Sequence, residues 1–320
     1  MPRVLITGGL GFIGLECCKI FVERGWSVNI LDIREANSSE RLRFEKTGVN
    51  IYQGDIRSRE AVEHAIESCS YVVNLAAQVS VQESIINPDE TIDVNVNGLQ
   101  NVIDCALEGK ILGLIHASSA AVYGNPSHLP LDENSEIRTI SPYAESKAIN
   151  EEQIRDARNT GLNAMSLRFF NVYGPSQRSD SAYASVIPNF IQKMLGGEAP
   201  TIYGDGKQTR DFVHVRDVSD VVVDLIVRDI EFEFSEANVS CNYQHSVLDI
   251  VQIINENLVK TGHIAEPLTP LYTAAREGDI LHSVGDNSRI SLILGRTIDD
   301  RFESGITKMI EHEISCSNRI

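Results

Sequence analysis

The chain has 320 residues, of which 28 are Lys or Arg and 45 are Asp or Glu, giving a formal net charge of −17. Binding of nucleic-acid phosphates needs a basic stripe, and the sequence contains none, so a nucleic-acid-binding protein is excluded. Hydrophobic residues make up 42% and charged residues 23%, which is typical of a globular chain with a sizeable core. No apolar run reaches the ~18 residues of a membrane span, and the first apolar run begins too early for a signal peptide. The six cysteines show no CxxC spacing, and we expect reduced thiols in a soluble, cytoplasmic protein.

Strands and helices alternate through the first half of the chain. Short apolar runs typical of buried parallel strands occur at 4–6, 26–31, 49–52, 71–75, 111–116 and 163–169. Helical patterns lie between them, at 13–24, 58–67, 93–107 and 142–158. This alternation predicts an α/β fold with a doubly wound parallel sheet and right-handed crossovers.

The rhythm changes after Val172, where glycine-rich turns separate short strands from helices. Helical stretches are expected at 186–195, 218–228, 247–259 and 306–313. We therefore predict a first domain over residues 1–172 and a smaller C-terminal α/β lobe over 173–320. The pattern is compatible with some interleaving of the lobe's elements with the sheet.

Glycines at 8, 11 and 14 form a G-x-x-G-x-x-G turn between the first strand and the first helix. Glycine permits a tight turn and close approach of the backbone to a pyrophosphate, and the helix N-terminus presents free N–H groups to it. Asp32 ends the second strand, where a carboxylate can accept both ribose hydroxyls of NAD and repels the 2′-phosphate of NADP. Arg34 is the nearby residue that could accommodate NADP instead. We predict an NAD site, with Asp55-Ile56 beside the adenine.

A candidate catalytic pair opens the helix predicted from residue 142. Ser141 is a good N-cap and Pro142 fits the first helical position, so Tyr143 and Lys147 lie four residues apart on one face. A tyrosine that acts as a base near neutral pH needs its pKa lowered by about three units, which corresponds to about 4 kcal/mol. An ammonium group a few ångströms away, together with an oxidised nicotinamide ring, can supply about that much.

The Y-x-x-x-K spacing occurs a second time, at Tyr203 and Lys207, but two intervening glycines make that copy a turn without a shared helical face. The pair at Tyr143 gains support from Ser119, in the segment 118–124 after a predicted strand. Ligands of such folds bind at the carboxyl ends of strands, where a hydroxyl can bridge a substrate oxygen and the tyrosine. Taken alone, a serine that caps a loop is the alternative.

Together these residues resemble the extended short-chain dehydrogenase/reductase superfamily, in its NAD-dependent sugar epimerase/dehydratase group. The resemblance runs nearly end to end, through 7–14, 74–78, 95–98, 118–124, 143–147, 168–175, 203–206, 209–215 and 276–279. It implies that NAD is held by Gly8, Gly11, Phe12, Ile13, Gly14, Asp32, Asp55, Ile56, Leu75, Ala76, Ala77, Asn95, Tyr143, Lys147 and Phe170. It implies a Rossmann domain followed by a nucleotide-sugar-binding lobe.

The residues after Ser119 discriminate within that group. Dehydratases and decarboxylases of the group typically carry an acidic residue there, whereas this chain has Ala120 and Ala121. The resemblance therefore implies 4-epimerisation of a UDP-hexose through a transient 4-keto sugar, as in UDP-glucose and UDP-N-acetylglucosamine 4-epimerases. Tyr143 is then the base, Ser119 its hydrogen-bonding partner at the sugar oxygen, and Lys147 the residue that holds the cofactor ribose and sets the tyrosine pKa.

The resemblance also implies where the substrate lies. Arg210 is the leading pyrophosphate clamp, Arg276 a second cation and Asp279 a ribose partner, although an isolated arginine often makes only a weak surface ion pair. The small Ser283 occupies a position where large residues exclude N-acetylated sugars, so we expect such sugars to be admitted. The full set of expected substrate contacts is Ser80, Ser119, Tyr143, Asn171, Ser185, Val186, Tyr203, Arg210, Arg276, Asp279 and Ser283.

Several other assignments complete the expectations. No histidine cluster has ligand spacing, so no metal site is predicted, and His116 and His214 are expected in the core. The resemblance implies a homodimer that pairs the helices before residue 111 and after residue 141 as a four-helix bundle. The alternatives are a UDP-glucuronate epimerase, a decarboxylase or a 4-keto-sugar reductase of the same group, or, from another class, a non-catalytic dinucleotide-binding sensor.

Overall fold

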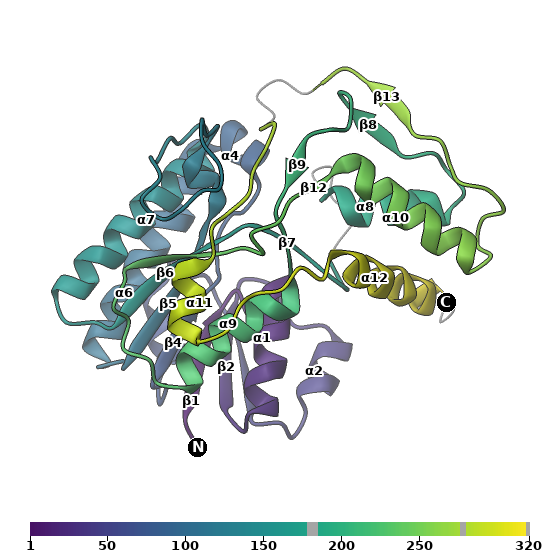
Figure 1. The fold of residues 1–320 in the computed structure, drawn as a ribbon. Helices are drawn as coiled ribbons and strands as arrows, with labels where there is room; N and C mark the ends of the chain where they lie inside the picture. Colours follow the sequence, from purple (N-terminus) through teal and green to yellow (C-terminus); the bar gives the residue numbers. More distant parts are fainter. Residues whose placement is uncertain (178–184, 276–279, 318–320) are drawn as a thin grey trace.

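The computed structural model describes residues 1–177, 185–275 and 280–317. Seven parallel strands form the central sheet, in the order β11-β6-β5-β4-β1-β2-β3 (Figure 1). These strands are β1 (Arg3–Thr7), β2 (Ser27–Asp32), β3 (Val49–Gln53), β4 (Tyr71–Asn74), β5 (Gly113–Ser119), β6 (Ala164–Phe169) and β11 (Glu236–Val239). The predicted doubly wound parallel sheet is confirmed.

Helices cover both faces of this sheet, which is why its central strands are buried and mostly apolar. One layer consists of α1 (Phe12–Glu23), α9 (Val215–Val227) and α11 (Ser288–Leu294), and the other of α3 (Arg59–Ile66), α6 (Gly98–Glu108) and α7 (Pro142–Asn159). Val4 and Ile6 pack into the first layer and Leu5 into the second, because successive strand side chains point to opposite faces. Every helix of the described part of the chain is too short or too polar to cross a membrane.

Short elements surround the carboxyl edge of the sheet. They are α2 (Ser38–Phe44), α4 (Val81–Ile86), α5 (Pro88–Ile92), the π-helical turn η1 (Asp93–Asn97) and the 3₁₀ turn η2 (Ala120–Tyr123). The single helix expected over 93–107 is therefore a π-helical turn followed by α6, and such π-helical turns are common at functional sites. Ser119, expected in a loop, is the last residue of β5.

A second lobe packs its own core beside the sheet (Figure 1). It contains α8 (Val186–Leu195), α10 (Val247–Lys260) and α12 (Phe302–Ser317), with the two-stranded ladders β7 (Asn171–Tyr173) with β10 (Phe212–His214), β9 (Thr209–Arg210) with β12 (His245–Ser246), and β8 (Thr201–Tyr203) with β13 (Leu271–Thr273). Three elements from beyond residue 172, α9, β11 and α11, lie with the sheet instead. The chain thus passes between the sheet and the second lobe more than once.

The close packing of α1 on the turn after β1 generates a prediction. A methyl group at Gly14 would lie 2.6 Å from the carbonyl oxygen of Gly8 and 2.6 Å from the Cα of Gly9, and both are backbone atoms. We expect Gly14→Ala to lower the free energy of unfolding by about 1–3 kcal/mol, measured by chemical denaturation. Gly196→Ala is the control, because a methyl group there meets no atom closer than 3.3 Å. Equal stability of the two variants would contradict this packing.

Candidate active site

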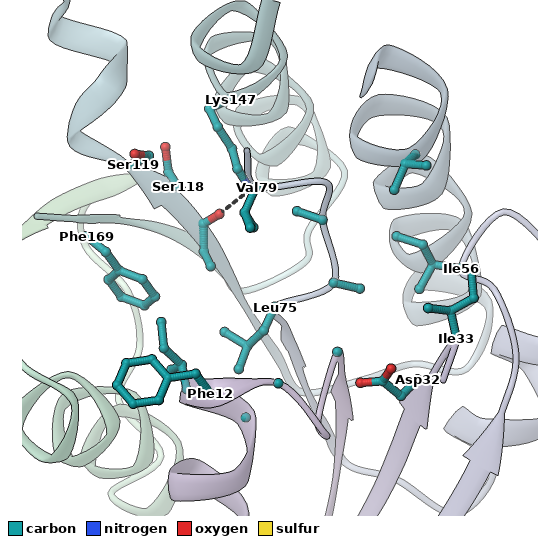
Figure 2. Close-up of a pocket in the computed structure, with 18 of the residues that line it drawn as sticks. Phe12, Asp32, Ile33, Ile56, Leu75, Val79, Ser118, Ser119, Lys147 and Phe169 are labelled. Atoms are coloured by element: carbon teal, nitrogen blue, oxygen red, sulfur yellow. Dashed lines mark hydrogen bonds between the residues drawn. The ribbon is translucent and has the colours of Figure 1, made fainter. Parts of the chain in front are cut away.

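A cavity of about 560 Å³ opens at the carboxyl edge of the sheet. Figure 2 shows Asp32, Ile33 and Ile56 at one end of it and Ser119 with Lys147 at the other. Every residue predicted to contact the cofactor, with the exception of Asn95, lines this cavity: Gly8, Gly11, Phe12, Ile13, Gly14, Asp32, Asp55, Ile56, Leu75, Ala76, Ala77, Tyr143, Lys147 and Phe170. The parallel strands explain this convergence, because their carboxyl ends meet at one edge.

The glycine turn gives the cavity a floor of bare backbone. Gly8 has φ +65° and a Cβ there would lie 2.8 Å from the amide nitrogen of Ala76, so only glycine fits. Gly11 caps α1 without a side-chain hydrogen bond, and the first turn of α1 carries no acidic residue. The first N–H groups of α1 are therefore left to a ligand, and their partial positive charge suits a pyrophosphate.

The charged groups at the Asp32 end of the cavity favour the ribose of NAD, which carries no 2′-phosphate. The carboxylate of Asp32 accepts hydrogen bonds from the backbone N–H groups of Leu10, at 3.0 Å, and Arg34, at 3.1 Å. The guanidinium of Arg34 donates to the Glu40 carboxylate at 2.6 and 2.8 Å and to the Leu10 carbonyl. Because Arg34 is held by a carboxylate and lies beside a second one, a 2′-phosphate would meet two negative charges, which fits NAD.

The candidate catalytic residues come from two elements. Ser119 ends β5, whereas Tyr143 lies in the first turn of α7, where Ser141 caps the helix by accepting from the Ala144 N–H at 3.2 Å. Lys147 lies one turn further along and is buried. Its Nζ lies 5.9 Å from the centre of the Tyr143 ring and donates to the carbonyl of Ala117 at 2.7 Å, the dashed line in Figure 2.

Burial dominates the ionisation of this pair. It raises the pKa of Tyr143, and the hydrogen-bonding side chain of Ser119 offsets only part of that rise. It also lowers the pKa of Lys147 to about 8, against a smaller opposing effect of the Glu151 carboxylate. Among the protein's own groups, the Ser119 hydrogen bond acts to lower the pKa of Tyr143, while the Lys147 ammonium points to Ala117. That Lys147 lowers this pKa in the NAD-bound enzyme stays a prediction. A cationic nicotinamide ring beside the phenol would also lower it.

Two predicted contacts lie just outside the cavity. Asn95 is buried and accepts from the N–H of Gln78 at 2.8 Å while donating to the Gln78 carbonyl at 3.1 Å and the Ser146 hydroxyl at 2.9 Å. It thereby fixes the loop that follows Ala77 against α7. Ser80 caps α4 by accepting from the Glu83 N–H at 3.1 Å. Both residues shape the wall rather than line it.

The other predicted substrate residues belong to the second lobe. Asn171, in β7, donates to the Asp211 carbonyl at 3.2 Å, and Arg210 donates to the Thr209 carbonyl at 2.9 Å. Ser283 is buried and its N–H bonds the same Thr209 carbonyl at 3.2 Å, so Arg210 and Ser283 are neighbours. The remaining described members are Ser185 and Val186 at the start of α8 and Tyr203 at the end of β8. Arg276 and Asp279 lie outside the described residues.

Several residues that line the cavity were missed from the sequence, and one of them is the cation Arg57. Arg57 lines the Asp32 end and makes ion pairs with Asp55 at 2.7 Å, Asp93 at 2.9 Å and Glu90 at 3.1 Å. These ion pairs tie the loop after β3 to α5 and η1. The spacing of Asp55 and Arg57 was visible in the sequence, but the partners 33 and 36 residues away were not.

The described residues contain no group of three or more His, Cys, Asp and Glu side chains placed to hold a metal ion. The six cysteines are free, and four of them, Cys17, Cys18, Cys105 and Cys241, are buried.

A glycine turn after β1, an aspartate ending β2 and a Tyr-Lys pair facing the same cavity define a dinucleotide-dependent enzyme of the Rossmann type. Residues 4–233 match the model of the NAD-dependent epimerase/dehydratase family, and the chain belongs to this family. NAD is its cofactor, in agreement with the glycine turn after β1 and the Asp32 carboxylate described above.

Similar proteins include enzymes of two activities. The UDP-glucose 4-epimerase of Mycolicibacterium smegmatis is 31% identical over 97% of each chain. The UDP-N-acetyl-alpha-D-glucosaminuronate decarboxylase of Bacillus cytotoxicus is 32% identical over 79% of each chain. The solved structure of UDP-N-acetylglucosamine 4-epimerase from Methanobrevibacter ruminantium M1, in complex with UDP-N-acetylmuramic acid, matches with a TM-score of 0.88 and 30% identity, covering 98% of this chain and 99% of that chain.

The ion pairs of Arg57 predict an effect on cofactor retention. We expect Arg57→Ala to speed NAD dissociation about three- to tenfold, because the wall at the Asp32 end loses its tie of about 1 kcal/mol. The measurement is the NAD content of the protein during dialysis. Arg59→Ala is the control, since Arg59 pairs with Glu63 and Glu108 on the surface. Equal loss of NAD from both variants would contradict this role.

Proposed function

We propose that the protein catalyses the NAD-dependent 4-epimerisation of UDP-hexoses, with UDP-glucose and UDP-galactose as one pair of substrates and UDP-N-acetylglucosamine and UDP-N-acetylgalactosamine as another. The observation that carries this proposal is that Ser119, Tyr143 and Lys147 meet on the wall of the cavity. Ser119 and Lys147 lie at the end opposite Asp32 (Figure 2). The epimerases among the similar proteins support the proposal. So do Ala120 and Ala121, which place no carboxylate directly after Ser119.

The roles of the residues follow from their chemistry. When bound, NAD supplies a reversible hydride acceptor for C4 of the sugar. Tyr143 takes the proton of the 4-hydroxyl and returns it at the end of the cycle, with Ser119 hydrogen-bonded to the same oxygen. Lys147 contributes a positive charge in a buried site, where charge acts more strongly than in water. The same single base serves both directions, so no further acid is required.

The second lobe is proposed to hold the nucleotide while the sugar presents either face. Asn171 and Arg210 would bind the pyrophosphate, with Arg276 as a second cation and Asp279 at the ribose. Ser185, Val186 and Tyr203 would line the uridine pocket. An anchor on the UDP part that leaves the hexose free to turn is what inversion at C4 needs, because hydride must return to the opposite face.

We further propose a homodimer in the cytoplasm, paired through α6 and α7. The support for this assembly is the family resemblance and the neighbouring position of these two helices on one side of the sheet (Figure 1). The free cysteines support a reducing compartment. Light scattering after gel filtration tests the dimer.

The proposed role of Tyr143 as the base can be tested by substitution. We expect Tyr143→Phe to lower kcat about 10²- to 10⁴-fold while the NAD content stays unchanged, because only the proton acceptor is lost. Epimers are resolved by NMR after incubation with a panel of UDP-hexoses, without added NAD. Tyr243→Phe, at an exposed tyrosine, is the control. Normal turnover by Tyr143→Phe would refute the mechanism, and release of CO₂ from a UDP-uronate would favour the decarboxylase instead.

The proposed role of Ser283 in admitting N-acetylated sugars can also be tested by substitution. Ser283 is a small buried residue beside Arg210, so a large side chain there would fill space available to an N-acetyl group. We expect Ser283→Tyr to lower kcat/KM for UDP-N-acetylglucosamine at least tenfold, by about 1.4 kcal/mol or more, with a smaller change for UDP-glucose. Ser288→Tyr, at an exposed position, controls for added bulk. Equal losses for both substrates would contradict the assignment.

A further inference from the structure

Three side chains of α7, each four residues from the next, contact the last three residues of β5. Tyr143 lies against the hydroxyl of Ser119, and the Nζ of Lys147 donates to the carbonyl of Ala117 at 2.7 Å. The third side chain is Glu151, whose Oε1 accepts from the Ser118 hydroxyl at 2.6 Å. Residues at i, i+4 and i+8 share one helical face, so a single stripe of α7 holds the whole end of the strand.

Glu151 is buried, with 2% of its surface exposed, and its carboxylate is fully engaged. Besides Ser118, Oε1 accepts from Nε of Arg168 at 2.9 Å, and Oε2 accepts from Nη2 of Arg168 at 2.8 Å. Arg168, in β6, is also 2% exposed and donates through Nη1 to the Tyr123 hydroxyl at 2.8 Å. The carboxylate therefore connects α7, β5 and β6 through three hydrogen bonds.

Stability alone does not explain such a pair. Removing two charges from water costs about as much as their attraction returns, so a buried ion pair is a weak source of net stability. Its geometry is another matter, because a bidentate Arg–carboxylate pair is charge-assisted and directional. Here it fixes the serine that precedes Ser119 relative to the helix that carries Tyr143 and Lys147.

We infer that Glu151 is a positioning residue for the proposed reaction: it fixes the end of β5 against α7 and places a negative charge one helical turn from Lys147. This inference rests on the proposed function only for its effect on turnover. The tie to Ser118 and the charge beside Lys147 are properties of the protein itself.

The groups around Lys147 set the direction of the charge effect. From its own helix Lys147 faces Glu151, which raises the pKa of Lys147, and burial lowers that pKa to about 8. From β5 it faces His116, which is neutral because burial and Lys147 lower the pKa of its ring. From β6, Arg168 is balanced by Glu151. Removing the negative charge of Glu151 removes the effect that raises the pKa of Lys147, so we expect that pKa to fall.

The experiment compares three variants of the NAD-bound enzyme. Glu151→Gln removes the charge and keeps the shape, Ser118→Ala removes the tie to β5 and keeps the ion pair, and Glu152→Gln is the control at the exposed neighbouring glutamate. The chain has eight lysines, so Lys147 can be followed by NMR of ¹³C-labelled lysine and assigned from a Lys147→Met sample. The same samples are assayed for kcat, KM and the pH dependence of kcat.

We expect Glu151→Gln to move the Lys147 titration, and the alkaline limb of kcat with it, about one pH unit lower. We expect Ser118→Ala to lower kcat about three- to tenfold with KM within twofold and the Lys147 titration unmoved. Glu152→Gln should match the parent protein.

Two outcomes would overturn the inference. One is a Glu151→Gln protein whose Lys147 titrates as in the parent, even if its stability and kcat are lower, because that is a structural effect only. The other is full activity of Ser118→Ala, which decides the positioning role even if Glu151→Gln does not fold. If the parent protein epimerises no sugar but the Lys147 titration still moves in Glu151→Gln, the proposed function fails while the charge coupling stands.

Discussion

Packing of α7 on the last three residues of β5 is the interaction on which the reactive end of the cavity depends. β5 lies inside the sheet with β4 on one side and β6 on the other, so its end cannot shift without breaking two ladders of hydrogen bonds. Against this rigid edge the helix presents Tyr143, Lys147 and Glu151 in one stripe. A hydroxyl, a phenol and an ammonium are thus placed by backbone elements and not by loops, which favours a preorganised site.

Burial strengthens electrostatic interactions in this site, but it also disfavours the charged forms of Tyr143 and Lys147. It raises the pKa of Tyr143 and lowers that of Lys147, which are the wrong directions for a phenolate beside an ammonium. For Lys147, the nearby carboxylate of Glu151 raises the pKa and so offsets part of this effect. For Tyr143, a bound oxidised NAD would supply the compensating positive charge. Under the proposed mechanism, Tyr143 then acts as a base only in the NAD-bound enzyme.

The second lobe is joined to the sheet by another buried carboxylate, Asp211. It accepts from the backbone N–H groups of Cys241 at 2.8 Å and Gly285 at 3.2 Å, and burial raises its pKa to about 7. Its backbone carbonyl accepts from the N–H of Asn171 at 3.0 Å. The segments that carry Asn171, Arg210 and Ser283 are therefore gathered around one residue, which explains how distant parts of the chain come together in the second lobe.

The local features could be predicted from the amino-acid sequence: apolar runs separated by helical patterns, the glycines at 8, 11 and 14, and Tyr143 and Lys147 one turn apart. These depend on periodicity and spacing within a few residues, which side-chain chemistry controls directly. The folded protein was needed to show that Arg57 pairs with α5, that Glu151 accepts from Ser118, and that Lys147 points to Ala117. Those contacts join residues about 30 positions apart in the chain. The direction of the Tyr143 pKa shift depends on how deeply Tyr143 is buried, which no local sequence pattern records.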